Sequence, residues 1–250
     1  MGVNVFHGDC RYGVPLCGEF DFVFADPPFN IGHGYDGYDD NREDFDAFTS
    51  EWVEVCWNAC SGVMALHGPD ALAEKYLVEA RRLGMRRIAW VNWHYRFGQC
   101  NRHNWIDARC HCLIFSKNEK WTWNPEEVLV TSDRVKYGDK RVNETERGGK
   151  RLPGTVWGIP SDGDFWGRVS GTSKERRGHH PNQLPEVYLE RLIRAYTNPG
   201  DRVLDPFAGS GTTAVVAHTL GRECVTFDVS ETNVASIRDR LAAGAVRVKP

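Results

Sequence analysis

Residues 202–214 read RVLDPFAGSGTTA and are the strongest single indication of the fold. The first four residues, with apolar Val203 and Leu204 at their centre, are typical of a short strand, and the glycine loop that follows opens a helix. The next apolar run, Glu223–Phe227, ends at Asp228. In an open α/β sheet this order places a crevice at the carboxyl ends of the strands, where Gly209 and Gly211 let the backbone approach a ligand and Asp228 can accept hydrogen bonds from two ribose hydroxyls. We therefore expect a nucleotide-type cofactor site.

Apolar runs alternate with amphipathic segments along the rest of the chain, which predicts an α/β fold with a mainly parallel sheet. Strands are expected at Val3–Phe6, Phe20–Ala25, Gly62–Leu66, Arg86–Asn92, Arg109–Ser116, Arg202–Asp205 and Glu223–Phe227. Helices are expected from Glu43 to Ala59, from Pro185 to Tyr196, after Gly211 and from near Ser230. Residues 29–42, FNIGHGYDGYDDNR, have no hydrophobic periodicity, which predicts a loop that can move. Residues 131–180 interrupt the alternation and predict an insertion on the same domain.

Composition indicates an ordered protein inside the cell. The 250 residues are 41% hydrophobic and 26% charged, enough for one large domain, and the mean hydropathy is −0.49. No apolar run approaches the roughly 18 residues of a membrane span. The first twenty residues carry Asp9, Arg11 and Glu19, which a secretory signal would not, and the eight cysteines are typical of reduced thiols. We expect a cytoplasmic protein with no membrane partner and no disulfide framework.

Positive charge is concentrated in one segment although the whole chain has net charge −3. Residues 130–180 hold 11 Lys and Arg against 7 Asp and Glu. Such a segment is either a solvated face or a strip that touches phosphates. The candidate phosphate contacts are Arg168, Lys174, Arg176 and Arg177, followed by His179 and His180.

A second loop, DPPFN at 26–30, follows a strand and offers acceptors without donors. Pro27 and Pro28 have no N–H, so the carbonyls of Asp26 and Pro27 stand beside one carboxylate. This arrangement suits a planar amino group with two hydrogens to donate, such as N6 of adenine or N4 of cytosine. Phe29 is available to stack on the ring. As a bare turn the motif is ambiguous, and its position at the end of an apolar strand favours the functional interpretation.

Three separated motifs, HGD at 7–9, DPPFN at 26–30 and the segment from His180 to Ala214, resemble the S-adenosylmethionine-dependent amino-methyltransferases of DNA. Their order, catalytic motif first and glycine loop last, is similar to the beta group of that family. The resemblance implies a Rossmann-like, circularly permuted sheet. It also implies a catalytic half at 1–130, a small basic target-recognition insertion at 131–180 and a cofactor-binding half at 181–250.

The resemblance further implies roles for individual residues. The catalytic residues would be Asp26, Pro27, Pro28 and Phe29, with Asp26 and the Pro27 carbonyl region accepting the two amino hydrogens and Phe29 stacking on the extruded base. The cofactor would contact Asp9, Asp26, Asn182, Gln183, Asp205, Phe207, Gly209, Ser210, Gly211, Thr212 and Asp228. Leu184 stands where a Lys is common, and Phe29 where a Tyr is common. The implied partner is double-stranded DNA bound by a prokaryotic or phage-encoded enzyme, either as a monomer or as a homodimer, with any restriction nuclease on another chain.

Alternatives remain open from the sequence. The resemblance favours adenine-N6 over cytosine-N4 methylation, because in that family an Asp at the start of the DPPF motif goes mostly with adenine. The Gly/Tyr loop with Tyr35 and Tyr38 is either a lid or a solvated loop. A non-catalytic DNA-binding relative and a nicotinamide-dependent oxidoreductase are the other classes, the latter because the glycine loop also fits G-x-G-x-x-A.

Cysteine and tryptophan positions are interpreted as structural. The spacing C-x2-H-x6-C-H-C from Cys100 lacks paired knuckles, so no metal is expected. Cys110 and Cys112 are expected on one face of a strand, and Cys56 and Cys60 on a helix. The Trp residues at 90–93, 105 and 121–123 are expected mainly in the core.

Overall fold

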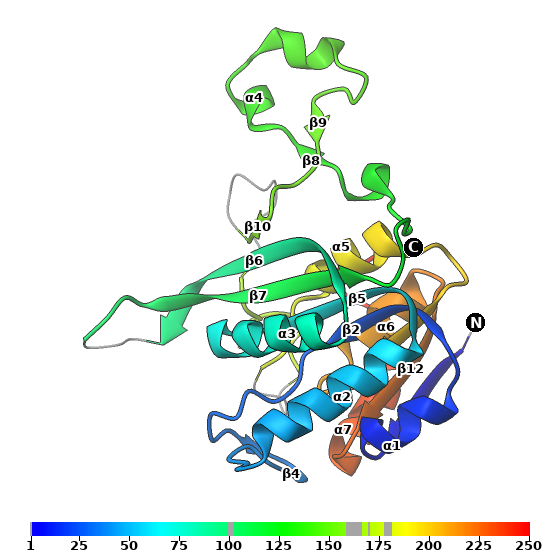
Figure 1. The fold of residues 1–250 in the computed structure, drawn as a ribbon. Coiled ribbons are helices and arrows are strands. Elements are labelled where there is room, and N and C mark those ends of the chain that lie inside the picture. Colours follow the sequence, from blue (N-terminus) through cyan, green and yellow to red (C-terminus); the bar gives the residue numbers. More distant parts are fainter. Residues whose placement is uncertain (1, 100–102, 159–166, 170, 178–181) are drawn as a thin grey trace.

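A computed structural model describes residues 2–99, 103–158, 167–169, 171–177 and 182–250 of the chain. Its centre is an eight-stranded sheet of order β1-β12-β11-β2-β5-β7-β6-β10 (Figure 1). The strands are β1 (Val3–His7), β2 (Phe20–Ala25), β5 (Cys60–Gly68), β6 (Arg86–Gln99), β7 (Asp107–Ser116), β10 (Val156–Trp157), β11 (Arg202–Asp205) and β12 (Glu223–Asp228). Pairing is parallel except on both sides of β7, which is antiparallel to β5 and β6. The expected α/β fold with a mainly parallel sheet is confirmed.

Helices cover both faces of this sheet (Figure 1). One face carries α1 (Cys10–Gly13), α2 (Phe45–Ala59) and α3 (Asp70–Arg82). The other carries α5 (Glu186–Tyr196), α6 (Thr212–Thr219) and α7 (Glu231–Ala243). Short 3-10 turns lie at Val14–Leu16, Pro125–Val128 and Lys140–Glu144.

Strand β2 lies in the middle of the sheet and explains why the run FDFVFA is almost continuously apolar. Phe22 and Phe24 pack into the core under α5 and α6, whereas Val23 and Ala25 pack into the core under α2 and α3. A strand covered on both faces needs apolar residues at successive positions. The chain therefore leaves the buried centre of the sheet at Asp26, directly after β2.

The segment 29–42 is organised rather than irregular. It contains a two-stranded hairpin, β3 (Gly34–Tyr35) and β4 (Tyr38–Asp39). Asp40 is 2% exposed, and its carboxylate accepts the backbone N–H groups of Asn30, Ile31 and His33 at 2.8–3.1 Å. One buried acid thus fixes both ends of the hairpin, which the lack of a period could not reveal.

Residues 130–151 form a small unit beside the sheet, at the top of Figure 1. It consists of β8 (Val130–Thr131), α4 (Asp133–Lys136) and β9 (Lys150–Arg151), and β8 pairs with β9. The chain then returns to the main sheet as β10, which pairs with β6. The glycine-loop strand β11 has a central position although it comes late in the chain. The circular permutation and the role of the insertion stay predictions.

Several expectations need correction. Helix α3 was not expected, although Leu72, Ala73, Tyr76 and Ala80 have helical spacing and are buried. Cys60 begins β5 and does not belong to the helix, because the buried strand extends two residues further back than its apolar run suggests.

The tryptophans do not all lie in the core. Trp93 is buried, but Trp105 is 90% exposed in the connection between β6 and β7, and Trp121 and Trp123 are also exposed. Cys110 and Cys112 do share one buried face of β7. The metal interpretation involves Cys100, which lies outside the described residues. Within the described parts of the chain, no helix is long and apolar enough to cross a membrane.

Candidate active site

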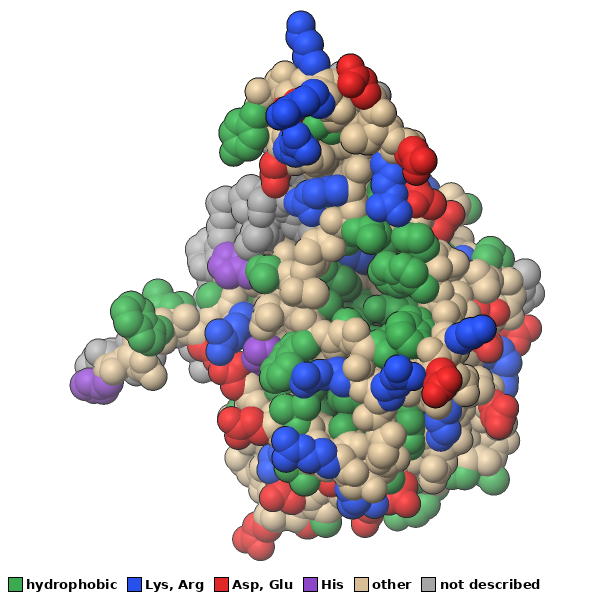
Figure 2. Space-filling view, turned by 45° about the horizontal axis from the view of Figure 1, so that its top comes forward, with side chains coloured by type: hydrophobic (Ala, Val, Ile, Leu, Met, Phe, Trp, Pro, Cys, Tyr) green, Lys and Arg blue, Asp and Glu red, His purple; other side chains and the backbone are tan. Residues whose placement is uncertain are grey.

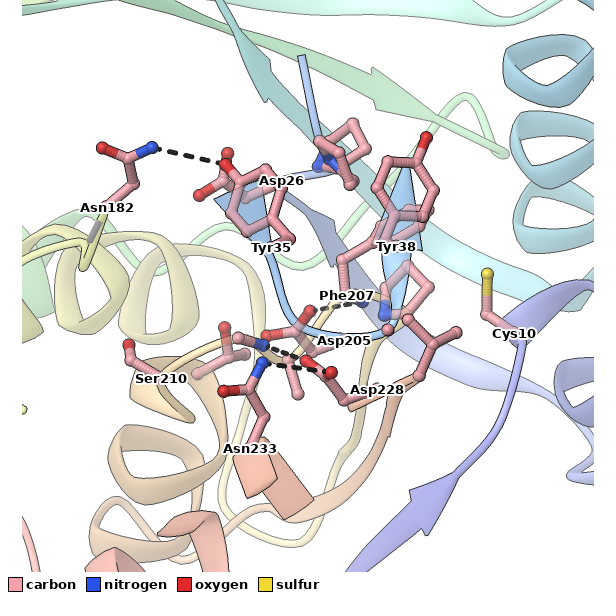
Figure 3. Close-up of a pocket in the computed structure, with 18 of the residues that line it drawn as sticks. Cys10, Asp26, Tyr35, Tyr38, Asn182, Asp205, Phe207, Ser210, Asp228 and Asn233 are labelled. Atoms are coloured by element: carbon pink, nitrogen blue, oxygen red, sulfur yellow. Dashed lines mark hydrogen bonds between the residues drawn. The ribbon is translucent and has the colours of Figure 1, made fainter. Parts of the chain in front are cut away.

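A cavity of about 260 Å³ lies where β1, β12, β11 and β2 end (Figure 3). These four strands are parallel neighbours, so their carboxyl ends meet at one edge of the sheet. The cavity is lined by the DPPF loop after β2, the glycine loop after β11, the acid after β12, the hairpin residues Tyr35 and Tyr38, and Asn182. Segments far apart in the sequence therefore share one site.

The glycine loop is held rigidly against β12. The N–H of Gly209 donates to Asp228 Oδ2 at 2.8 Å, and the N–H of Phe207 donates to Asp205 Oδ1 at 3.0 Å. Asp228 Oδ1 accepts from the Ser230 N–H and the Asn233 side chain. These bonds place the Asp228 carboxylate at the wall of the cavity, where its remaining acceptor positions can meet hydroxyl groups.

Asp26 faces the same cavity with unused hydrogen-bonding capacity. Its Oδ1 atom is buried and has no hydrogen-bond partner. Burial, and then the charge of Asp205, raise the pKa of Asp26 to about 8. Burial is also the main cause that raises the pKa of Asp205 to about 7. A buried oxygen without a partner is costly to maintain, and two desolvated carboxylates in one cavity are typical of a functional site.

The backbone after Asp26 is fixed by Asn30. This residue has φ +59°, a left-handed conformation that Asn tolerates better than most side chains. Its Oδ1 accepts the Arg42 N–H at 2.7 Å and its amide donates to the Arg42 carbonyl at 3.2 Å. Asn30 thereby ties the DPPF loop to the end of the hairpin segment. The sequence alone indicated no role for it.

Tyr35 and Tyr38 both line the cavity, and the lid interpretation stays a prediction. The amide of Asn182 donates to the Tyr35 hydroxyl at 3.3 Å, across the cavity from the glycine loop (Figure 3). Burial raises the pKa of Tyr35 to about 12, so its hydroxyl keeps its proton. The hairpin is therefore linked to the segment before α5.

Most of the expected site residues are brought together. The cavity wall includes Asp9, Asp26, Pro27, Pro28, Phe29, Asn182, Asp205, Phe207, Gly209, Ser210, Thr212 and Asp228. The Asp9 carboxylate is bound by the backbone and guanidinium of Arg11, so its side chain caps α1 at the edge of the site.

Two expected cofactor residues are placed elsewhere. Gln183 is 5% exposed and bridges the Glu175 carbonyl and the Arg177 N–H, because its amide is both donor and acceptor. Gly211 caps α6 with φ +76°, and a Cβ there would lie 2.8 Å from Ile237 rather than in the cavity. Both residues shape the site from behind its wall.

The four basic candidates differ in exposure. Lys174 and Arg168 are exposed, and Arg168 donates to Asn182 Oδ1 at 3.0 Å. Arg176 is half-buried and donates to a backbone carbonyl. The Nε atom of Arg177 is buried without a partner, which makes it a poor phosphate contact. His179 and His180 lie outside the described residues.

Comparison with known proteins agrees with this geometry. A DNA methylase family model, N6_N4_Mtase, matches residues 20–239. The DNA adenine methyltransferase YhdJ of Escherichia coli K12 is 30% identical over 245 residues, covering 91% of this chain and 78% of the relative. The Type II methyltransferase M.HpaI of Haemophilus parainfluenzae is 29% identical over 228 residues, covering 89% and 68%.

Solved structures share the fold. The M1.HpyAVI–SAM complex matches with a TM-score of 0.68 at 18% identity, covering 96% of this chain and 99% of that one. The cytosine-N4-specific PvuII DNA methyltransferase matches with a TM-score of 0.70 at 16% identity, covering 95% and 86%.

The family match, the fold, and the DPPF and glycine loops that line the cavity define an S-adenosylmethionine-dependent methyltransferase. The nicotinamide alternative is therefore wrong. More specifically, the chain belongs to the DNA methylase family, which comprises adenine-N6 and cytosine-N4 methyltransferases.

Proposed function

We propose that this protein transfers a methyl group from S-adenosylmethionine to the N6 amino group of adenine in a specific sequence of double-stranded DNA, after flipping the base out of the helix. The observation that carries the proposal is the partnerless, buried Oδ1 of Asp26 in the same cavity as the glycine loop and Asp228. An acceptor with no partner in the protein matches an amino group that arrives with the substrate.

The residues at the wall fit the cofactor. Asp228 is oriented by three donors and can receive the ribose hydroxyls, and the glycine loop leaves room for close approach. Phe207 lies edge-on to Trp52 at 5.1 Å between ring centroids, giving a rigid apolar wall for the adenine ring. Asn182 and Ser210 line the other end, near the amino-acid part. When bound, S-adenosylmethionine supplies the sulfonium methyl group.

The chain's own residues prepare the amino nitrogen. Its lone pair is delocalised into the ring, so it is a weak nucleophile. In-plane acceptors at the Asp26 carboxylate and the Pro27 carbonyl help the nitrogen become tetrahedral and free the pair. Phe29 stacks on the base, and Pro28 keeps the loop free of N–H donors. Positioning and electrostatic stabilisation then supply most of the acceleration.

DNA binding is assigned to the exposed basic side chains near the cavity and on the 130–151 unit. Lys174 and Arg168 lie on the segment that follows β10. Blue side chains gather over the upper unit in Figure 2. The exposed basic residues of the 130–151 unit include Arg134, Arg141, Arg147 and Lys150. We assign target recognition to 131–180, between a catalytic half at 1–130 and a cofactor half at 181–250, with any nuclease on another chain. The cytoplasmic location and the homodimer stay predictions.

Nucleoside analysis tests the proposal. Purified protein is incubated with mixed-sequence duplex DNA and methyl-labelled S-adenosylmethionine, and the DNA is digested to nucleosides. Label in N6-methyl-2′-deoxyadenosine supports the proposal. Label in N4-methylcytosine would replace the base and keep the class, and no label with the wild type but normal cofactor binding would indicate the non-catalytic relative. The Asp26→Ala variant is the inactive control.

A further inference from the structure

The turn of the β3–β4 hairpin forms one wall of the cavity. All four residues of the turn line the cavity (Figure 3). At one end Tyr35 lies beside Asp26, so that, besides burial, the charge of Asp26 raises the pKa of the Tyr35 hydroxyl. At the other end the Tyr38 ring packs against Phe48 at 6.0 Å between centroids, and Phe48 packs against Phe207. The hairpin therefore spans the cavity from the DPPF motif to the glycine loop.

The tip of the hairpin is held on the N-terminus of α7. The Ser230 hydroxyl donates to Asp36 Oδ2 at 2.6 Å. Ser230 is the N-cap of α7 and its Oγ accepts the Asn233 N–H at 3.1 Å, so its single hydrogen is directed to the carboxylate. Hydrogen bonds from Ser230 and Thr232 lower the pKa of Asp36, which keeps this group ionised at neutral pH. A negative charge at this position also suits the helix dipole.

The turn is packed tightly against the loop between β12 and α7. Gly37 has φ +73°, and a Cβ there would lie 3.1 Å from the Val229 carbonyl oxygen. Gly37 and Val229 both line the cavity, so their contact completes its wall near Asp228. The N–H of Ser230 donates to Asp228 Oδ1 at 2.8 Å. The hairpin is therefore attached at the place where the ribose of the cofactor is proposed to bind.

The hairpin is fixed firmly at its base and weakly at its tip. At the base, the buried Asp40 carboxylate accepts three backbone N–H groups. At the tip, Asp36 and Gly37 are exposed, so water can replace the hydrogen bonds of the Asp36 carboxylate. Exposed hydrogen bonds mark the parts of a protein that open locally. The tip can therefore leave α7 while the base keeps its structure.

Tyr38 opposes the closed position of the hairpin. Its hydroxyl is buried and, within the described parts of the chain, has no hydrogen-bond partner. Burial raises the pKa of Tyr38 to about 12, so the hydroxyl keeps its proton. A buried polar group without a partner is destabilising, and opening would return this hydroxyl to water. Asp36 thus favours the closed position and Tyr38 disfavours it, as a segment with two accessible positions requires.

We propose that the β3–β4 hairpin is a strap across the cofactor cavity, and that the latch between Asp36 and the N-terminus of α7 sets the rates at which S-adenosylmethionine enters and S-adenosylhomocysteine leaves. The inference rests on the proposed function, because it takes the cofactor's place in the cavity from it. The latch lies at the rim of the cavity, so it controls cofactor exchange and not the transfer of the methyl group.

Cofactor exchange measured without DNA tests the strap. Methyl-labelled S-adenosylmethionine is mixed with the full chain, and its association, and its release after a chase with unlabelled cofactor, are followed by rapid filtration. Asp36→Ala removes the latch and should raise both rate constants roughly threefold to tenfold. Tyr38→Phe removes the cost of closure and should lower both roughly threefold or more. The dissociation constant should stay within about threefold of wild type in both variants, because a gate changes entry and exit together.

Asp39→Ala is the matched control. Asp39 is an exposed acid on the same hairpin, and its carboxylate accepts the Asn41 N–H and not a group on α7, so its rates should equal those of wild type. Rate constants that shift in the same direction in Asp36→Ala and Tyr38→Phe, or in neither, would overturn the strap. A faster release with unchanged association in Asp36→Ala would make Asp36 a cofactor contact and would also overturn it. A wild-type protein that binds no S-adenosylmethionine would instead refute the proposed function at its cofactor.

Discussion

Replacing Asp26 by Asn is expected to stabilise the protein while it removes methyl transfer. Burial and the charge of Asp205 raise the pKa of Asp26 from 3.8 to about 8 in the folded chain. At about 1.4 kcal/mol per pKa unit, burying Asp26 lowers the free energy of unfolding at pH 7 by about 4 kcal/mol. Asp26 is partly exposed to the cavity, and solvent there screens its charge. We therefore expect Asp26→Asn to raise the free energy of unfolding by about 2 kcal/mol.

The direction in which stability changes with pH follows from proton binding. Between about pH 4 and pH 8 the unfolded chain has released the Asp26 proton while the folded chain retains it, so stability falls as pH rises. Below about pH 4 both states are protonated and the cost disappears. The advantage of Asp26→Asn should therefore grow from about pH 5.5 to pH 8 and level off above.

Urea unfolding followed by tryptophan fluorescence measures the difference in stability between Asp26→Asn and wild type at about pH 5.5 and at about pH 8. Asp46→Asn is the control, because the Asp46 side chain is 82% exposed on α2. In the same samples, Asp26→Asn should lose at least about a hundredfold in transfer rate, because an amide donor replaces an acceptor, and should bind S-adenosylmethionine within about tenfold of wild type. An Asp26→Asn protein that is no more stable than wild type at pH 8 would refute the assignment of Asp26 as a strained, substrate-directed acceptor.

Further expectations concern the pH profile, stacking, the glycine loop and DNA binding. Because burial raises the pKa of Asp26 to about 8, kcat/KM for methyl transfer should rise with pH towards that value, and a flat profile between pH 6 and 9 would contradict it. Phe29→Ala should lower kcat/KM roughly tenfold to a hundredfold in initial-rate assays, whereas Phe29→Tyr should stay within about threefold; equal losses would exclude stacking. Gly211→Ala should cost about 2–3 kcal/mol in urea unfolding through its positive φ and a clash with α7, against about 1 kcal/mol for Gly84→Ala, which has positive φ in open space. Lys174→Gln should reduce the salt slope of DNA binding by about one at every sequence, and an unchanged slope would remove it from the interface.

The sequence predicted the central sheet well because its inner strands, such as β2, are buried on both faces. All seven expected strands occur, since a run such as FDFVFA has no stable alternative to a covered strand. It failed where local order depends on the burial of a single polar side chain. The hairpin within 29–42 is held by Asp40, and neither its polarity nor its spacing distinguishes such an acid from a solvated one.

Within the site, chemistry that follows a strand directly was predictable. Asp26, Asp205 and Asp228 each end a parallel strand, so topology alone brings them to one edge. Residues behind the wall were not predictable, because their roles are set by which helix packs against which loop. Arg240 shows this most clearly: in the sequence it is one of several basic residues on an amphipathic helix, and the fold places it under the glycine loop.

The position of Gln183 behind the cavity wall links two segments of the chain. Its amide ties the Glu175 carbonyl to the Arg177 N–H, and Glu175 in turn accepts the first N–H of α5 at 2.8 Å. The basic segment proposed to bind DNA is thus linked by buried hydrogen bonds to the helix that also carries Glu186, the partner of Arg240. Displacing that segment would cost the free energy of these bonds, because buried hydrogen bonds have no solvent to replace their partners. Gln183, which was expected to touch the cofactor, therefore connects the helix beside the cavity to the segment that is proposed to bind DNA.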